Sequence, residues 1–179
     1  MQTSLSPHPS FGNLGLGNIE IEIERPSQSL VHVRYTIVGD ISQIVVPPRA
    51  EPLRTDGLWE STCFELFLRP AGEEGYLELN FAPSGEWAAY AFRGYRDGMV
   101  QAAMPCSPDI STSVTTDRLE VKVALSAWLD EGRYGMNIAA ILRDSAGGRS
   151  FWAAHHAGGE PDFHHPGCFR EQLPAAPRP

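Results

Sequence analysis

The residues best placed for chemistry are a carboxyl, an amide and a phenol in one short stretch of the chain. Segment 76–92 alternates apolar and polar side chains, turns at 83–85 and alternates again, which predicts two antiparallel strands joined as a hairpin. In that register Glu78 faces Tyr90, and Asn80 lies two residues further along on the same face. Carboxylates and amides hydrogen-bond vicinal hydroxyls while aromatic rings cover apolar surface, so this mix is suited to a sugar-like ligand.

A second carboxyl comes from the strand predicted over 62–68. In this strand Glu65 lies on the face opposite Phe64 and Leu66, so it joins Glu78 on the polar side of the sheet. Two carboxylates on neighbouring strands repel each other unless a hydrogen-bond donor lies between them. We therefore expect these polar residues to line a partly open concave patch, and an ordinary solvated sheet face is the alternative interpretation. The opposite face should lie in the core, through Phe64, Leu66, Leu77, Leu79 and Phe81.

Three further candidate ligand-binding residues lie outside these strands. Trp59 follows an irregular loop predicted over 47–57, and loops of this kind concentrate binding residues. Its ring could stack on a ligand, although most Trp residues of a β-sandwich lie in the core. Arg54 and Arg143 could supply positive charge beside the carboxyls.

The segment 155–165, HHAGGEPDFHH, is rich in histidine. Adjacent residues on a strand point to opposite faces, so its histidines cannot all converge on Asp162. The spacing matches no established zinc pattern, and we expect no metal site. We expect His156, Asp162 and His164 to border the ligand site, and hydrogen bonds that only hold the loop are the alternative.

The chain is acidic, with 14 Lys and Arg against 22 Asp and Glu and a formal net charge of −8. That balance argues against binding to nucleic acid or to an anionic membrane surface, because both need a basic face. No apolar run approaches the roughly 20 residues that cross a bilayer. The first residues lack the basic start and apolar stretch of a signal peptide. We therefore expect a cytoplasmic protein.

The three cysteines, Cys63, Cys106 and Cys168, include no C-x-x-C pair. An odd number without that spacing supports neither a disulfide framework nor a zinc knuckle. We expect all three to stay reduced, as in a reducing compartment.

Short segments of alternating hydrophobicity fill most of the chain, separated by turns rich in Gly, Pro, Asp and Asn. About ten strands without crossover helices predict an all-β fold, an antiparallel two-sheet β-sandwich of jelly-roll or immunoglobulin-like type. We expect one domain over 18–173, a poorly ordered segment over 1–17 and a flexible tail over 174–179. The predicted strands cover 18–24, 29–40, 41–46, 59–69, the two arms of 76–92, 100–104, 110–116, 119–125, 133–143 and 149–156.

Three motifs carry a resemblance to a known family. The segment W-x-x-T-C-F-E, the hairpin N-F-x-P-S-G-x-W and the closing PDFHHPGCF together span roughly residues 55–170. With them the chain resembles the DOMON-like β-sandwich proteins, relatives of the family-nine carbohydrate-binding modules. The resemblance implies a two-sheet sandwich whose ligand site is made by one sheet face and its loops, with sugar or haem as the ligand. In family-nine modules paired tryptophans sandwich the sugar, and Trp59 matches one of them.

Members of this group share a name with a cell-wall flavin reductase, but the chain has no G-x-G-x-x-G and no second substrate domain. Our first interpretation is a non-catalytic module for a small polar ligand, a carbohydrate or sugar derivative, with no cofactor. One alternative is an enzyme acting on a sugar or cell-wall precursor through paired carboxylates, although no nucleophile elbow, P-loop or Cys–His pair is present. Another is haem binding through Met and His ligands, for which Met99, Met104 and Met136 are available. The oligomeric state stays open.

Overall fold

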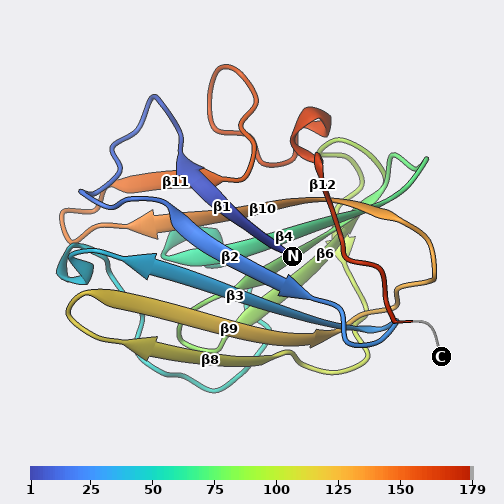
Figure 1. Cartoon of the computed structure of the whole chain (residues 1–179), viewed down its shortest axis with the longest axis horizontal. Helices are drawn as coiled ribbons and strands as arrows, with labels where there is room; N and C mark the ends of the chain where they lie inside the picture. The colour runs from blue at the N-terminus through green and yellow to red at the C-terminus, as the bar shows by residue number, and fades with distance from the viewer. Residues whose placement is uncertain (178–179) are drawn as a thin grey trace.

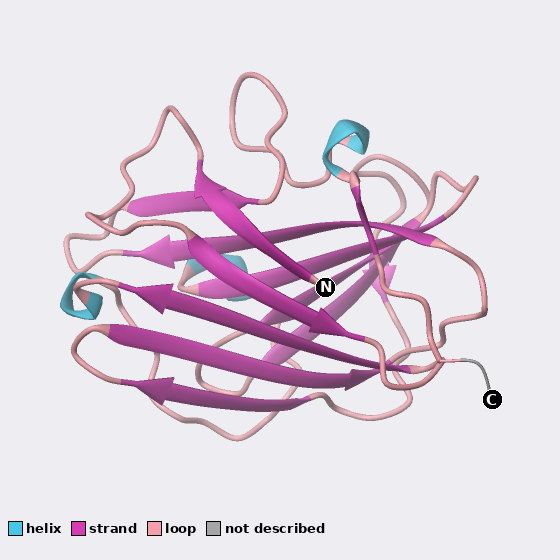
Figure 2. Ribbon diagram, viewed as in Figure 1, coloured by secondary structure: helices cyan, strands magenta, loops and turns pink. Residues whose placement is uncertain are grey.

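Antiparallel strands make up nearly all of the regular structure. The structure is a computed structural model that describes residues 1–177. Within this range the helical segments are three short 3₁₀ turns, which Figure 2 shows in cyan among the magenta strands: η1 (Ile41–Gln43), η2 (Leu58–Glu60) and η3 (Pro166–Cys168). The strands are β1 (Gln2–Pro7), β2 (Ile19–Glu24), β3 (Leu30–Val38), β4 (Cys63–Pro70), β5 (Tyr76–Phe81), β6 (Trp87–Phe92), β7 (Val100–Gln101), β8 (Asp109–Val114), β9 (Arg118–Ser126), β10 (Tyr134–Arg143), β11 (Arg149–Ala153) and β12 (Glu171–Gln172).

The strands form one continuous hydrogen-bonded path, in the order β7-β6-β5-β4-β10-β11-β1-β2-β3-β9-β8, with β12 beside β10. The path curls, so that in Figure 1 the half from β1 to β8 lies in front of the half that holds β4, β6 and β10. The main core fills the space between the halves. Tyr35 of β3 packs against Phe64 of β4 with ring centroids 4.9 Å apart. The Tyr35 hydroxyl also donates a hydrogen bond to the backbone carbonyl of Glu65.

The prediction of an all-β antiparallel fold is confirmed, and the prediction of two separate sheets needs correction. Strand β1 pairs with β2 through Gln2–Leu5 and with β11 through Ser6–Pro7. It therefore joins the two halves along one side and leaves no open edge there. Covering a sheet edge satisfies backbone groups that would otherwise attract another chain.

The expectation of a poorly ordered segment over 1–17 is therefore wrong for residues 2–7. Leu5 is fully buried in the main core, and Leu16 packs there as well. A single inward apolar residue in QTSLSP is too weak a pattern to predict a strand, and the pairing on both sides supplies the rest. At the other end Leu173 is buried and residues 174–177 have no regular structure. The last part of the predicted tail, 178–179, lies outside the described residues.

The 41–46 segment is not a strand. It folds as η1 and an extended stretch, with Asp40 accepting a hydrogen bond from the Ser42 backbone N–H at the start of the turn. Ile41 and Ile44 are still buried. The apolar pattern of this segment therefore predicted burial correctly but predicted the wrong backbone conformation.

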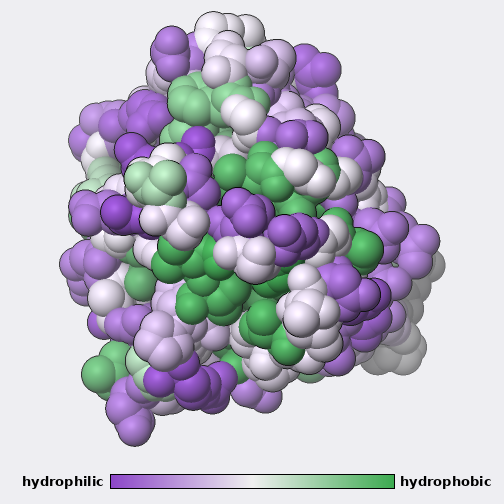
Figure 3. Space-filling model, turned by 90° about the vertical axis from the view of Figure 1, so that its left-hand side faces the viewer, coloured by the Kyte–Doolittle hydropathy of each residue, from purple (hydrophilic) through white to green (hydrophobic). Residues whose placement is uncertain are grey.

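Figure 3 views the end of the molecule at which β3 and β8 finish, and apolar side chains gather across its centre. Val38 and Val114, the last residues of these two strands, are exposed. Exposed apolar residues of this kind are common on soluble proteins and need no ligand to explain them.

The hairpin that carries the candidate chemistry folds in the predicted register. Glu78 pairs with Tyr90, Asn80 with Ala88 and Phe81 with Trp87. Of the predicted core residues, Phe64, Leu66, Leu79 and Phe81 are buried and Leu77 packs partly buried against the core. The opposite face is also covered, by a second apolar cluster: Leu58, Cys63, Phe67, Tyr76, Ala82, Ala88, Tyr90, Phe92, Ala139, Ile141, Ala153, Phe163 and Phe169.

Candidate functional site

A cavity of about 450 Å³ lies on the outer face of the β4–β5–β6 sheet, beside this second apolar cluster. Strands β4 and β5 supply two carboxyls to it, and three loops or turns supply most of the remaining walls. This volume lies within the range typical of small-molecule sites. The lining residues are Trp59, Glu65, Glu78, Phe92, Arg96, Met99, Ile141, Phe151, Pro161, Phe163 and His164.

The two carboxyls are the deepest polar groups of the site. Glu65 is 3% exposed and Glu78 is 5% exposed. Asn80 faces Glu65 across the strand pair, and its Nδ2 donates a 2.7 Å hydrogen bond to Oε1 of Glu78. Asn80 is itself fully buried, and its Oδ1 has no donor within the described residues. Asn80 therefore supports the carboxyls from behind and does not line the cavity.

Burial shifts the protonation of both carboxyls. It raises the pKa of Glu65 well above the usual value, and the nearby charge of Glu78 raises it further. Burial also raises the pKa of Glu78, against the opposing effects of the Asn80 hydrogen bond and of Arg96. The pair therefore holds protons under conditions in which exposed carboxyls would be ionised. A protonated carboxyl can donate a hydrogen bond as well as accept one.

His164 lies beside Glu78 and faces the cavity as a neutral ring. Its Nδ1 is 2.8 Å from the Tyr76 hydroxyl, and its Nε2 is 3.7 Å from Oε2 of Glu78. Burial, with a smaller effect from the Arg96 charge, lowers the pKa of His164 to about 4. Near neutral pH His164 is therefore a hydrogen-bonding group and not a cation.

Arg96 places a guanidinium on the cavity wall, and Asp162 holds it there. Its Nη2 and Nε donate to the same Asp162 oxygen at 2.9 and 3.2 Å, while the Tyr95 hydroxyl donates to the other at 2.6 Å. Although burial opposes the shift, the hydrogen bonds from Tyr95 and Arg96 lower the pKa of Asp162. Arg96 also has a φ of +52°, in the left-handed region that non-glycine residues seldom adopt. Strain of this kind persists where the surrounding structure holds the residue in place.

Trp59 supplies the largest aromatic wall and comes from η2. Gly57, with a φ of +77°, turns the chain into this 3₁₀ segment. The indole packs edge-on against the Tyr90 ring with centroids 6.0 Å apart, and the Tyr90 hydroxyl donates to Asp56 at 2.6 Å. Three phenylalanines complete the aromatic lining, Phe92, Phe151 and Phe163. The site therefore combines flat apolar walls with a small set of polar groups.

Four predicted ligand-binding residues line the cavity, namely Trp59, Glu65, Glu78 and His164. From outside the cavity, Asn80 bonds Glu78 and Tyr90 packs against Trp59, while Asp162 bonds Arg96, which also lines the cavity. Whether any of them touches a ligand stays a prediction.

The structure does not bring the other three predicted residues to the cavity. Arg54 packs its guanidinium over the Trp87 ring, 4.5 Å from the centroid, and donates to the carbonyl of Ala102. Arg143 donates to the carbonyl of Glu60, and His156 bonds the carbonyl of Ser6 on β1. These contacts hold loops in place. The sequence therefore did not show that these three side chains lie away from the carboxyls.

Sequence reasoning missed most of the cavity wall. The hairpin register could have predicted Phe92, because the register that pairs Glu78 with Tyr90 also pairs Tyr76 with Phe92 on the same face. Phe163 lies within the motif PDFHHPGCF but carried no role there. Arg96 and Met99 come from the 93–99 turn region after β6, where no local pattern indicates which way a side chain points.

Other chemistry in the described chain is limited. Within residues 1–177 no group of three or more His, Cys, Asp or Glu side chains is arranged to hold a metal ion. Of the methionines considered as haem ligands, Met99 lines the cavity, whereas Met136 is buried in the main core and Met104 packs against it.

Cys63, Cys106 and Cys168 are all free thiols. None of the helical turns in residues 1–177 has the length and apolar character to span a bilayer.

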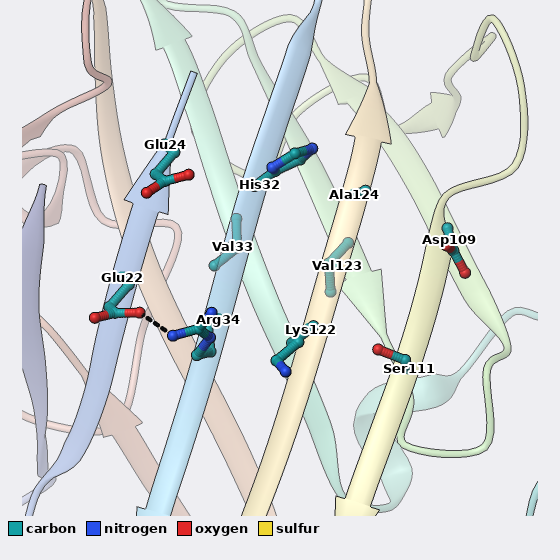
Figure 4. Close-up of a pocket in the computed structure, with 10 residues that line it drawn as sticks. All are labelled: Glu22, Glu24, His32, Val33, Arg34, Asp109, Ser111, Lys122, Val123 and Ala124. Atoms are coloured by element: carbon teal, nitrogen blue, oxygen red, sulfur yellow. Dashed lines mark hydrogen bonds and ion pairs between the residues drawn. The ribbon is translucent and has the colours of Figure 1, made fainter. Parts of the chain in front are cut away.

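A second, smaller hollow of about 200 Å³ lies on the outer face of β2, β3, β9 and β8 (Figure 4). Its charged and polar side chains lie on the outer sheet surface, and Figure 4 marks the ion pair between Glu22 and Arg34. Both partners are about half exposed, with 41% and 45% of their side-chain surface accessible. Exposed pairs of this kind contribute little to stability. This face is the ordinary solvated sheet, in contrast to the covered face that holds Glu65.

No family model matches the sequence, and no curated protein matches it in sequence. Solved structures do share its fold. One is a proposed carbohydrate-binding protein from Bacteroides uniformis, with a TM-score of 0.62, 13% identity, and coverage of 95% of this chain and 84% of that one. Another is a family 9 carbohydrate-binding module from Caldicellulosiruptor kristjanssonii in complex with cellotriose, with a TM-score of 0.58, 9% identity, and coverage of 89% and 74%. The chain thus has the β-sandwich-like fold of carbohydrate-binding modules.

Proposed function

We propose that this protein is a non-catalytic carbohydrate-binding module and that the 450 Å³ cavity holds the sugar. The observation that carries the proposal is the pairing of the Trp59 ring with two buried carboxyls on one cavity of a sheet face. Sugars present an apolar face of C–H groups and an equatorial belt of hydroxyls. Aromatic rings cover the first, and carboxyl, imidazole and guanidinium groups hydrogen-bond the second.

Three of the four polar groups that line the cavity are suited to hydroxyl recognition because they are already oriented. Glu78 is fixed by Asn80, His164 by Tyr76, and Arg96 by Asp162. A preorganised site spends less free energy on ordering its side chains when the ligand binds. Binding would therefore need little rearrangement of the sheet.

The shared fold supports the same proposal at the level of architecture. The two neighbours described above are named for carbohydrate binding, and one was solved with cellotriose. We also propose that the chain is a DOMON-like member of this architecture, on the basis of the three sequence motifs, and that it is cytoplasmic. A fold by itself does not fix a ligand, so the residues of the cavity carry the argument.

Binding without catalysis is favoured by the state of the two carboxyls. A glycosidase needs one carboxyl protonated and its partner ionised, in environments that separate their pKa values. Here burial raises the pKa of both Glu65 and Glu78. The enzymatic alternative predicts release of new reducing ends from a disaccharide, which a turnover assay would detect.

Isothermal titration calorimetry with three matched β-1,4 disaccharides tests the proposal: cellobiose, its 2-amino counterpart and its 2-acetamido counterpart. We expect at least one to bind, and we expect Trp59→Ala to weaken that binding by about tenfold or more, because it removes apolar surface that the ligand would cover, worth about 1.5–3 kcal/mol. Trp128→Ala is the matched control, because Trp128 is 73% exposed and does not line the cavity. Binding of none of the three, or equal binding by wild type and Trp59→Ala, would overturn the proposal.

A further inference from the structure

The Glu65 carboxyl is buried at the cavity and has no partner. It is 3% exposed and lines the cavity, yet no hydrogen bond to its side chain forms within residues 1–177, and Glu78 has one, from Asn80. Buried polar groups in folded proteins nearly always have a hydrogen-bond partner. Because this carboxyl opens onto the cavity, a bound ligand can supply the partner that the described residues do not.

No lysine or arginine nitrogen of the described residues lies within 4 Å of either carboxyl. The nearest basic group is His164, whose Nε2 is 3.7 Å from Oε2 of Glu78, and it is neutral near pH 7 because its pKa is lowered to about 4. The Arg96 guanidinium faces the cavity but donates twice to Asp162. The titratable groups around the site come from every element that packs against it. They are Cys63 and Glu65 on β4, Tyr76 and Glu78 on β5, Tyr90 on β6, Tyr35 on β3, Asp56 before η2, Tyr95 and Arg96 after β6, and Asp162 and His164 before η3.

With both carboxyls ionised, this set has an excess of negative charge that Arg96 cannot neutralise. Glu65, Glu78, Asp162 and Asp56 would carry four negative charges against one positive charge at Arg96. The walls around them are the rings of Trp59 and Phe92, whose faces attract cations. Carboxylates beside aromatic faces make a setting that favours a small ammonium group.

We propose, as a refinement that rests on the proposed function, that the bound sugar carries a free amine whose ammonium group lies between the Glu65 and Glu78 carboxyls. An ammonium has three donors, enough to reach Glu65 and Glu78 together. Its charge-assisted hydrogen bonds are roughly twice as strong as neutral ones. A hydroxyl at the same ring carbon offers one donor and no charge. An acetamido group offers one N–H and adds an acetyl group to a cavity with fixed walls.

Proton release accompanies this mode of binding. Burial raises the pKa of both carboxyls, so the free site binds protons more tightly than exposed carboxyls do, and an ammonium favours the ionised forms. Binding of the amino sugar therefore releases protons to solvent. Its affinity rises with pH until the amine of the ligand loses its own proton, whereas a neutral sugar has no such gain.

The experiment uses the same three disaccharides, titrated calorimetrically at pH 5, 6 and 7 in pairs of buffers with different ionisation enthalpies. We expect the amino disaccharide to bind about tenfold or more tighter than cellobiose at pH 7, with proton release that cellobiose lacks. Glu65→Gln keeps the shape of the side chain and removes its charge. It should abolish the amine preference and the extra proton release, so that the amino disaccharide binds the variant no tighter than cellobiose does.

The outcomes separate the two proposals. Equal or tighter binding of cellobiose overturns the amine inference and leaves the carbohydrate function intact. Binding of none of the three sugars overturns both. An amine preference that survives in both Glu65→Gln and Glu78→Gln, each with a cooperative melting transition, overturns the placement of the ammonium group between these carboxyls.

Discussion

Asn80 donates a 2.7 Å hydrogen bond to Glu78, two residues earlier on the same strand, and both side chains are buried. Strand geometry alone brings them together, since residues i and i+2 share a face. Asn80 does not line the cavity, so its main role is to hold the Glu78 carboxyl, which does.

Replacing Asn80 with Ala should therefore lower the free energy of unfolding by about 1–3 kcal/mol, because Glu78 loses its donor while it stays buried. Urea denaturation followed by tryptophan fluorescence measures the loss. The matched control is Asn18→Ala, an exposed residue, for which the change should stay within about 0.5 kcal/mol. If the two variants lose the same stability, the Asn80–Glu78 bond does not support the fold.

Glu65→Gln should make stability less dependent on pH. Because burial raises the folded-state pKa of Glu65, the folded chain holds a proton that the unfolded chain releases near pH 4.5. The contribution of Glu65 is fully present below that pH and is lost as pH rises toward the folded-state pKa. Wild type should therefore lose stability relative to Glu65→Gln as pH rises above 4.5. Denaturant titrations at several pH values test this, with the exposed Glu24→Gln as control; a constant difference across the range contradicts it.

His164 should give the opposite slope. Its pKa falls from the usual 6.5 to about 4 on folding, so the unfolded chain binds a proton that the folded chain excludes. Wild type should lose stability relative to His164→Gln as pH falls from 6.5 to 4, by up to about 3 kcal/mol, while the neutral variant is free of this effect. Comparing both proteins by denaturation across this window isolates the histidine. His32→Gln, on the outer face of β3, is the control, and parallel curves for wild type and His164→Gln would rule the effect out.

Arg96 should respond differently to Ala and to Gly. Both substitutions remove the ion pair with Asp162, but only Gly relieves the left-handed backbone at a φ of +52°. Arg96→Gly should thus be about 1 kcal/mol more stable than Arg96→Ala. At Arg93, an exposed residue outside the positive-φ positions, the order should reverse, since Gly only adds flexibility there. Melting temperatures of the four variants test this prediction. If the Ala variant is more stable than the Gly variant at both positions, the backbone at Arg96 is not strained.

The sequence determined the hairpin and its faces. Residues 76–92 carry their own turn, and the period of two assigns each side chain to one side of the sheet once that turn fixes the register. This is local information, so the pairing of Glu78 with Tyr90 and the core position of Leu79 followed from the chain alone. The all-β class followed for the same reason.

Only the tertiary structure decided that this polar face is a cavity. The cover comes from Trp59, from Arg96 after β6 and from Phe163 and His164 near the C-terminus, which are far apart in sequence. Their meeting depends on how distant loops settle over the sheet, and no local periodicity encodes that. The same holds for β1, whose pairing with both β2 and β11 closes the path. A short polar strand is ordered by the partners it finds, so its structure appears only when the whole fold is assembled.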